Sequence, residues 1–378
     1  MKSIPGPSVV HAVRFGRILV ILIGAAILPA GHGCSASPFG KDAATTTTIT
    51  PEPGAATADG AVAPPAAPPG EEPGETPVDE LSKKQVLERA VAQIVTSSRS
   101  ADPFLRANAI EAAHPLPDRI LPLVQLGLDD DHEAVRFAAV FTAGKLRLHP
   151  TVARLRAMND ERSPSVRAAR LFALRRCGDR VNLTPLAAML DRPDPTLRGN
   201  VALLLGQLGD ESAIAMLKSI AKRPSAPRIR DVEMMIVKIQ VAEAIVDLGE
   251  LDQIETIRAA LYSEYDEVRV IAVRMLGRLG DRQYRDALVP MLDRNPVEQR
   301  LAAAESLARL GDARGLDHIL AVLGEEQTPV RAQAAIALAQ FGDPEADRAR
   351  RRLLLEDAHE QVRLAAAAAI VKRDRRRR

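Results

Sequence analysis

Two His-Glu pairs, His132-Glu133 and His359-Glu360, are the residues of this chain best suited to bind a metal. Imidazole and carboxylate side chains can ligate iron, and several such pairs held close together could support oxidation chemistry. The two pairs lie near opposite ends of the region with helical patterning, so we expect them to be far apart. We therefore predict no metal site and assign the pairs to helix N-termini, where the helix dipole favours a glutamate.

Nucleophilic and cofactor-binding residues are scarce as well. The chain has two cysteines, Cys34 and Cys177, which excludes a disulfide framework and a cysteine-rich metal site. Cys177 occupies a position that is apolar elsewhere in the chain, so we predict a small buried residue there. The sequence contains no phosphate-binding glycine loop, no Gly-x-Ser-x-Gly, no His-Glu-x-x-His and no Cys-x-x-Cys. We predict no catalytic residue and no cofactor, and therefore a protein that is not an enzyme.

The composition favours helices over sheets. Of the 378 residues, 46% are hydrophobic but only 3% are aromatic and none is Trp, so a core must be built from Ala, Leu, Val and Ile. These residues suit closely packed helices, whereas strands favour aromatic and β-branched side chains. The formal net charge is +2, from 51 basic and 49 acidic residues, which gives no general preference for nucleic acid.

Residues 1–34 have the layout of a signal peptide. A basic start with Lys2, Arg14 and Arg17 precedes an apolar run over residues 18–30 and then a group of small residues. This run is too short to cross the core of a membrane, which needs about twenty apolar residues. We therefore predict that the signal is cleaved and that the mature chain is exported.

Cys34 follows the small residue Gly33 at the end of this apolar run. The arrangement resembles the lipobox of bacterial lipoproteins, in which such a cysteine is diacylated and becomes the new N-terminus. The resemblance implies a lipid anchor on Cys34 and, because Ser35 is not acidic, sorting to the outer membrane. Cleavage near Ser37 without a lipid is the alternative, and both outcomes place the chain outside the cytoplasm.

Residues 35–80 form a linker that cannot bury a core. The stretch 41–80 holds eight prolines and seven threonines, and it carries eight acidic residues against the single base Lys41. Proline, low hydrophobicity and self-repelling charge predict an extended, disordered tether. The net charge that remains for residues 81–378 is +6.

From residue 81 onward the sequence is one repeat. Anchor arginines, most of them in a Val-Arg dipeptide, recur about every 31 residues, at Arg106, Arg136, Arg167, Arg198, Arg269, Arg300, Arg331 and Arg363. Lys238 stands in for the arginine that is missing from the one long interval. A glycine followed by Asp or Glu comes eleven residues after the anchor in six units, at Gly178, Gly209, Gly249, Gly280, Gly311 and Gly342. Two markers with one period predict an array of helical repeats.

Each unit has the pattern of a helical hairpin. In the unit of Arg269, the apolar residues Val268, Ala272 and Leu276 form one face of a helix. The glycine after this helix supplies a left-handed C-cap, and the acidic residue after the glycine can cap the next helix. Five aspartates seven residues before an anchor are expected to cap helix starts or to pair with the arginines; they are Asp129, Asp160, Asp191, Asp231 and Asp293.

The pattern Asp-x-x-x-x-x-Val-Arg-x-x-Ala with a closing Leu-Gly-Asp resembles the HEAT-like repeat of the phycobilisome-lyase type over about residues 81–373. The resemblance implies an all-α fold, a right-handed α-solenoid of about eight to nine helical hairpins, with atypical units as caps at its two ends. Two related enzyme classes are poor fits. Deoxyhypusine hydroxylase, a HEAT-repeat enzyme, holds two irons with four His-Glu pairs where this chain has two, and the phycobilin lyases match only through the repeat.

The second helix of each hairpin in such a solenoid lines the concave face. Positions one, five and nine after the anchor lie opposite the buried stripe of that helix. Apolar and basic residues gather at these positions, and we predict a partner-binding groove that comprises Phe137, Phe141, Lys145, Phe172, Arg176, Leu203, Arg274, Arg278 and Arg309. The alternative is that the phenylalanines pack as core between neighbouring helices.

Two basic segments remain. Residues 223–231 are longer than the matching junctions and form either a plain insertion or a contact element. The C-terminal arginines 375–378, with Arg350, Arg351 and Arg352 nearby, form a basic end that is solvated or binds an anionic envelope polymer or lipid headgroup, since an exported protein does not meet nucleic acid.

The sequence as a whole favours a non-enzymatic scaffold of the cell envelope that binds another protein through its concave face. It would be anchored by lipid to the outer membrane or face the periplasm. The alternatives are a lyase-type or enzyme-assembly subunit and a purely structural spacer.

Overall fold

The computed structural model describes residues 81–221 and 230–377. Over these ranges the chain forms helices and short 3₁₀ turns and contains no strand, as predicted for an all-α solenoid. The predicted signal peptide, Cys34 and the linker lie outside the described residues, as does most of the 223–231 insertion. None of the helices described is long and apolar enough to span a membrane.

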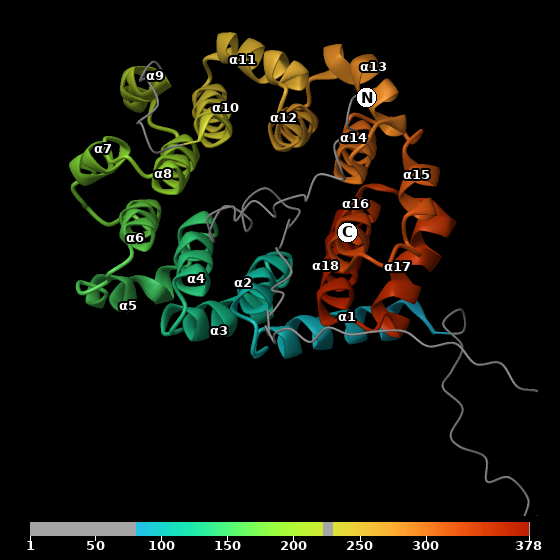
Figure 1. Ribbon diagram of the computed structural model, residues 1–378. Helices are drawn as coiled ribbons and strands as arrows, with labels where there is room; N and C mark the ends of the chain where they lie inside the picture. The colour runs from blue at the N-terminus through green and yellow to red at the C-terminus, as the bar shows by residue number, and fades with distance from the viewer. Residues whose placement is uncertain (1–80, 222–229, 378) are drawn as a thin grey trace, which may run out of the picture.

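The helices of the described ranges form two layers of nine, one from each half of every hairpin (Figure 1). The inner helices are α2 (Pro103–Ala112), α4 (Glu133–Lys145), α6 (Pro164–Arg176), α8 (Pro195–Leu208), α10 (Asp231–Asp247), α12 (Asp266–Leu279), α14 (Val297–Arg309), α16 (Thr328–Ala337) and α18 (Glu360–Arg377). The outer helices are α1 (Lys83–Ser97), α3 (Pro117–Leu128), α5 (Val152–Ala157), α7 (Thr184–Leu190), α9 (Ile214–Ala221), α11 (Ile254–Ala259), α13 (Arg285–Leu288), α15 (Leu316–Ala321) and α17 (Pro344–Glu356). Every anchor lies in an inner helix, so the predicted hairpin repeat is confirmed.

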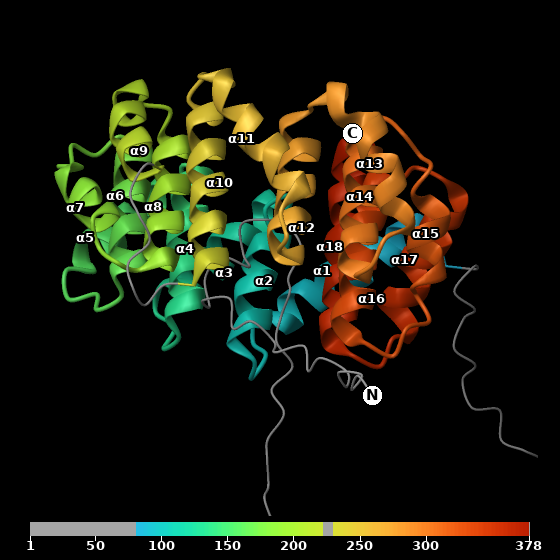
Figure 2. The same cartoon turned by 45° about the horizontal axis from the view of Figure 1, so that its top comes forward.

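The two ends of the solenoid meet, and the repeats close into a ring (Figures 1 and 2). Each inner helix packs against the next, and α18 packs against both α16 and α2. The first outer helix, α1, packs more extensively against α18 than against α2, its own hairpin partner. The terminal units were predicted to be separate caps; instead they cover each other, because the small rotation from one unit to the next adds up to a full turn.

Polar contacts hold this seam between the ends of the repeat array. The carboxylate of Glu360 at the start of α18 accepts hydrogen bonds from the hydroxyls of Ser97 and Ser100, at 2.8 and 3.1 Å. Arg351 of α17 donates to the backbone carbonyl of Leu81, at 2.9 Å. Beneath them α1 contributes a buried apolar face, comprising Val86, Ala90 and Ile94. The seam therefore combines an apolar core with hydrogen bonds between residues far apart in the sequence.

The basic C-terminal cluster of the sequence is only partly exposed. Arg350 is fully buried, and its guanidinium donates to the carbonyls of Leu338 and Phe341, at 2.6 and 3.1 Å. Arg351 donates hydrogen bonds to the Asp347 carboxylate and, across the seam, to the Leu81 carbonyl. Of the three neighbouring arginines only Arg352 extends into solvent, with 77% of its side chain exposed, so the predicted basic surface is smaller than expected.

The repeated glycines end inner helices in the left-handed conformation, as predicted. Five of them have positive φ; they are Gly178, Gly209, Gly249, Gly280 and Gly311. The unit of Arg136 has Arg147 in the same slot, and this residue also adopts a positive φ, of 51°. Gly342 differs, because α16 ends early at Ala337 and a 3₁₀ turn, Leu338–Gln340, follows it.

We expect Gly280→Val to destabilise the protein by about 1 to 2 kcal/mol, the cost of a left-handed backbone at a residue with a Cβ. Gly280 has a φ of 76°, and a Cβ there would contact nothing, so the cost comes from the backbone alone. Urea denaturation of the variant measures it. Gly280→Asn is the matched control, because Asn tolerates this conformation; equal stability of the valine variant and the wild type would contradict the cap.

Candidate binding site on the inner face of the ring

The anchor arginines bind within the protein and are structural. The Arg136 guanidinium donates to the carbonyls of Asp130 and Asp131, both at 2.8 Å, in the loop before its own helix. Its other edge pairs with the Glu161 carboxylate of the next unit, at 2.7 and 3.0 Å. The pairs Arg106–Asp130 and Arg331–Asp357 repeat this arrangement. The arginines therefore link successive units.

The acidic partners of these arginines are not the aspartates that the spacing indicated. The predicted residue Asp129 pairs with Arg154 instead of an anchor. The acid that meets an anchor lies six residues before the next anchor rather than seven, as Asp130 and Glu161 show. One residue of offset moves a side chain by about 100° around a helix, which spacing alone does not resolve at a loop.

We expect Arg331→Ala to lower stability by about 2 to 3 kcal/mol at pH 7, because it leaves Asp357 and two loop carbonyls without their donor. Burial raises the pKa of the Asp357 carboxyl, but the hydrogen bonds from Arg331 and the His359 amide, together with the charges of Arg331 and His359, outweigh burial and hold this pKa below its ordinary value. The contribution of the pair is thus complete above the ordinary carboxyl pKa of about 4 and is lost as the pH falls through the lower, folded pKa.

Denaturation of the wild type and Arg331→Ala at pH 7 and in acid checks this prediction. The difference between them should shrink in acid. Arg352→Ala is the control, because the Arg352–Glu356 pair is exposed and should contribute less than about 1 kcal/mol. A loss in Arg331→Ala no larger than in the control would contradict the structural role.

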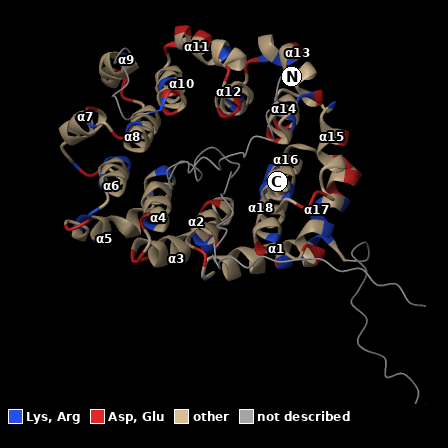
Figure 3. Ribbon diagram, in the orientation of Figure 1, with Lys and Arg blue, Asp and Glu red and all other residues tan. Residues whose placement is uncertain are grey.

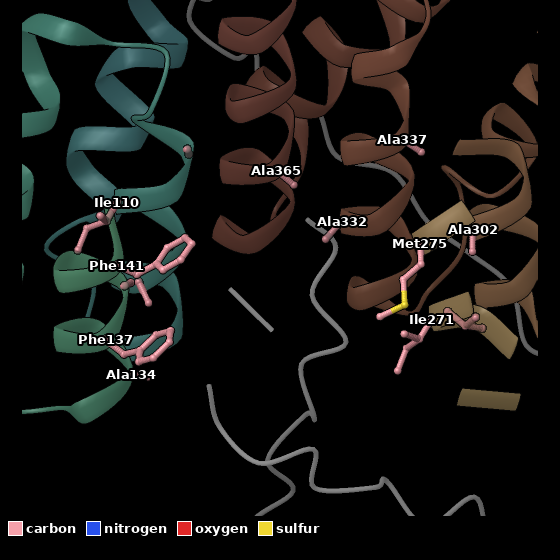
Figure 4. Close-up of a cluster of buried hydrophobic side chains, with 14 of the residues drawn as sticks. Ile110, Ala134, Phe137, Phe141, Ile271, Met275, Ala302, Ala332, Ala337 and Ala365 are labelled. Carbon is pink, nitrogen blue, oxygen red and sulfur yellow. The ribbon is translucent and has the colours of Figure 1, made fainter. Parts of the chain in front are cut away.

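The phenylalanines predicted to line an exposed groove are buried. Phe137, Phe141 and Phe172 are 0%, 2% and 1% exposed. Phe141 stacks on Phe172 at 5.4 Å between ring centroids and on Phe137 at 6.3 Å (Figure 4 shows Phe137 and Phe141 on α4 beside Ile110). Inner helices lie on a smaller circle than outer ones, so their neighbouring inward side chains touch. The prediction that these phenylalanines are exposed in a groove is therefore wrong, and the alternative, that they pack as core between neighbouring helices, is correct.

Three of the predicted basic contacts are paired within the protein. Arg274 is buried and lies 3.7 Å from the Glu305 carboxylate, which also accepts a hydrogen bond from Arg309 at 2.6 Å. Arg278 pairs with Glu243 of α10. Leu203 is partly buried against the core. Buried pairing removes Arg274 from any accessible surface, whereas Arg278 and Arg309 keep 33% and 24% of their side chains exposed.

A row of basic residues lies at one mouth of the ring. Position nine after the anchor falls at or near the C-terminal end of each inner helix, where helix carbonyls favour cations. The bases at this position are Lys145, Arg176, Arg278, Arg309 and Lys372. Figure 3 shows basic residues on α4, α6 and α18. Sequence reasoning found the first four and missed Lys372, although its spacing from Arg363 is the same.

A cavity of about 330 Å³ opens beside this row at the seam of the ring. Its walls come from α2 and α4 at one end of the repeat array and from α16 and α18 at the other. Alanines form much of the wall, and Glu111, His114, Lys145 and Lys372 supply charged or titratable groups. This cavity could not be predicted from local spacing, since the residues of its two sides are at least 187 positions apart in the chain.

The titratable groups of the cavity are strongly perturbed. Burial raises the pKa of Glu111 to about 7, even though Lys145 and Lys372 act in the opposite direction. Burial, with Lys145, lowers the pKa of His114 to about 3, and its Nε2 lies 2.8 Å from the Thr142 hydroxyl. Burial also lowers the pKa of Lys372. At neutral pH the cavity therefore holds a neutral imidazole and a carboxyl near the midpoint of its titration, beside the side-chain nitrogens of Lys145 and Lys372.

The other residues singled out for chemistry have structural contacts. His132 caps its helix by accepting a hydrogen bond from the Ala134 amide at 3.2 Å. Glu360 accepts a hydrogen bond from Ser97 across the seam. Ring closure leaves α18 and α4 separated by α2 alone, so the two His-Glu pairs are nearer than the linear repeat order indicated. Within the described ranges, no group of three or more His, Cys, Asp or Glu side chains could hold a metal ion. Cys177 is buried, as predicted.

Comparison with known proteins identifies the family of the repeat. The family model described as HEAT repeats matches residues 152–236, 235–308 and 295–371. No curated protein sequence matches the chain. Among solved structures, the CpcE–CpcF complex of phycocyanin lyase from Nostoc sp. PCC7120 is 23% identical, covers 60% of this chain and 91% of its own, and has a TM-score of 0.37. Human deoxyhypusine hydroxylase is 18% identical, with coverage of 79% and 99% and a TM-score of 0.35.

Proposed function

Because the chain belongs to the HEAT-repeat family, we propose that it is a non-enzymatic scaffold of the cell envelope that binds a partner protein at the basic mouth of its ring. Repeat solenoids expose long surfaces in which one register position recurs many times. The partner would present an acidic surface, since electrostatic complementarity speeds association and selects partners.

The observation that carries this proposal is the row of bases at position nine after the anchor. Lys145 is exposed and Arg176 is partly exposed at the ends of neighbouring helices α4 and α6. Neither forms an ion pair within the described part of the chain. In contrast, Arg278 pairs with Glu243 and Arg309 pairs with Glu305, so these two arginines are less available to a partner protein. The half of the mouth near α4 and α6 is therefore its most available cationic surface.

The envelope location rests on the N-terminal sequence. Residues 1–34 resemble an export signal, Cys34 resembles a lipidation site, and residues 35–80 have the composition of a tether. A coil of this length spans about 40 Å, enough to hold the ring clear of a membrane surface. Membrane fractionation of the full chain against Cys34→Ser tests the anchor: the wild type should sediment with membranes and the variant should not.

Affinity capture from envelope extract tests partner binding, with the full chain as bait. We expect one protein to be retained by the wild type and lost by the double variant Lys145→Glu, Arg176→Glu. The control is Lys83→Glu, Lys84→Glu, which changes the charge equally on exposed residues of the outer helix α1. Equal capture by all three baits, each of confirmed fold, would show that the basic mouth is not the binding surface.

A further inference from the structure

We propose that the cavity at the seam of the ring binds a small amphiphile with an apolar body and one carboxylate, and that this ligand bridges the first and last repeats. This site shares Lys145 with the proposed partner surface, but its other lining residues lie outside that surface, and either site could exist without the other. The volume of about 330 Å³ lies within the range of small-molecule sites and equals roughly eleven water-sized volumes of about 30 Å³.

Two alanines line the cavity at repeat positions where α4 has phenylalanines. Five residues after the anchor, the units of Arg136 and Arg167 have Phe141 and Phe172, whereas the unit of Arg363 has Ala368. One residue after the anchor, Phe137 of α4 corresponds to Ala332 of α16. Both alanines line the cavity. The space that phenyl rings fill in α4 and α6 is thus left open between α2, α16 and α18.

The polar groups of the cavity are matched to an anionic headgroup. Lys145 and Lys372 line it from opposite sides of the seam, and neither has a carboxylate within ion-pair distance in the described ranges. The side-chain nitrogen of Gln361 is buried at the same site with no hydrogen-bond acceptor in the described structure. Two ammonium groups and an amide N–H are donors that a carboxylate would satisfy together.

The apolar wall favours a hydrocarbon body. Leu364, Ala365, Ala368 and Ala369 of α18 face the cavity, with Ile336 and Ala339 on the adjoining side. Burying an apolar chain against these side chains removes both surfaces from water, which favours binding. The site therefore fits a chain of about ten carbons with a terminal carboxylate better than a small, fully polar anion.

Glu111 makes binding depend on pH. It is faced by His114 in the turn after its own helix, by Lys145 of α4 and by Lys372 of α18, while α16 presents only apolar groups to the cavity. Below its pKa of about 7, Glu111 is neutral and can donate a hydrogen bond to a ligand carboxylate; above it, two carboxylates repel. His114 stays neutral throughout this range because its pKa is lowered to about 3. Affinity should therefore rise as the pH falls from 8 to 6.

Because the walls come from both ends of the repeat array, the ligand should also stabilise the seam. A ligand that binds only the closed ring shifts the equilibrium toward closure by mass action. Hydrogen exchange of α1 and α18 should slow when the site is occupied, while exchange of α8 and α10 across the ring should change little.

Titration calorimetry of the full chain with decanoate, and with decanol as the uncharged probe, tests the proposal. We expect decanoate to bind at least about tenfold more tightly than decanol, and Lys372→Gln to remove that preference. Lys238→Gln, an exposed lysine on α10, should leave it unchanged. Glu111→Gln should bind decanoate with similar affinity at pH 6 and pH 8, whereas the wild type should weaken by about fivefold at pH 8.

Several outcomes would overturn the proposal. If decanoate does not bind, or if Ala368→Trp, which fills the cavity, still binds as tightly as the wild type, the cavity is not the site. If decanol binds as well as decanoate, the two lysines do not select an anion. If hydrogen exchange at the seam is unchanged by bound decanoate, the ligand does not bridge the ends of the ring. Circular dichroism confirms the fold of each variant.

Discussion

Gly277→Val is expected to lower the free energy of unfolding by about 3 to 4 kcal/mol, the largest effect of any single change considered for this ring. Gly277 lies inside α12, eight residues after its anchor, where α12 crosses α14. A Cβ at this position would lie 2.5 Å from Cβ and 2.7 Å from Cα of Ser306. The helices would have to separate, and Ser306 would lose its hydrogen bond to the Val273 carbonyl, now 2.9 Å long.

Urea denaturation followed by circular dichroism measures this loss. Gly324→Val is the matched control, because a Cβ at Gly324 meets nothing within 4 Å. Gly144 and Gly206 occupy the same position in their units and also approach the next helix, so bulky residues there should act in the same way. A denaturation midpoint of Gly277→Val equal to that of the control would contradict the close packing of inner helices.

Ile94→Asp is expected to open the ring without unfolding the rest of it. Ile94 is fully buried on α1, whose principal packing partner is α18, and a buried carboxylate without a base costs several kcal/mol. Units of a repeat array contact only their neighbours, so the remaining hairpins keep their packing. The radius of gyration from small-angle scattering should rise, and hydrogen exchange of α1 should become fast while most helicity remains.

Arg89→Asp is the control for this seam variant. Arg89 is exposed on the same helix, so the substitution adds an aspartate to α1 without burying it. The control should keep the radius of gyration and the exchange rates of the wild type. A compact Ile94→Asp protein with slow exchange in α1 would show that the seam tolerates the charge and does not depend on this apolar contact.

Features set by nearby residues could be predicted from the sequence. The helical face around Arg269, the hairpin unit and the left-handed glycine Gly280 each depend on residues less than one repeat apart, and the structure confirms all three. The burial of Cys177 follows from the same periodicity. Local spacing is sufficient for such features because a repeat imposes the same environment on each copy.

Features set by closure of the ring could not be predicted in this way. The hydrogen bond between Ser97 and Glu360 joins residues 263 positions apart. Periodicity fixes the rotation of a side chain about its helix but not the curvature of the whole array, which decides whether the ends meet. The same curvature buries Phe137 and Phe141, which were predicted to be exposed in a groove.

In the candidate site, too, some residues could be predicted from local spacing and others could not. Lys145, nine residues after Arg136, was singled out by its spacing, and the structure places it at the end of α4 in the cavity wall. Glu111 and His114 carry no motif and lie in the atypical first unit, so nothing in their spacing marked them. Burial perturbs both pKa values, and both residues line the cavity together with α18, which packs on α2 where the ends of the ring meet.

A distance measurement between α1 and α17 tests closure of the ring most directly. Spin labels at Lys83→Cys and Arg352→Cys, both exposed, would report it in a chain that also carries Cys34→Ser and Cys177→Ala. Since Arg351 reaches the Leu81 carbonyl and neighbouring helices pack about 8 to 10 Å apart, we expect one narrow distribution below roughly 30 Å. A broad distribution centred beyond about 40 Å would show an open solenoid and would contradict the closed ring, its seam cavity and its mouth.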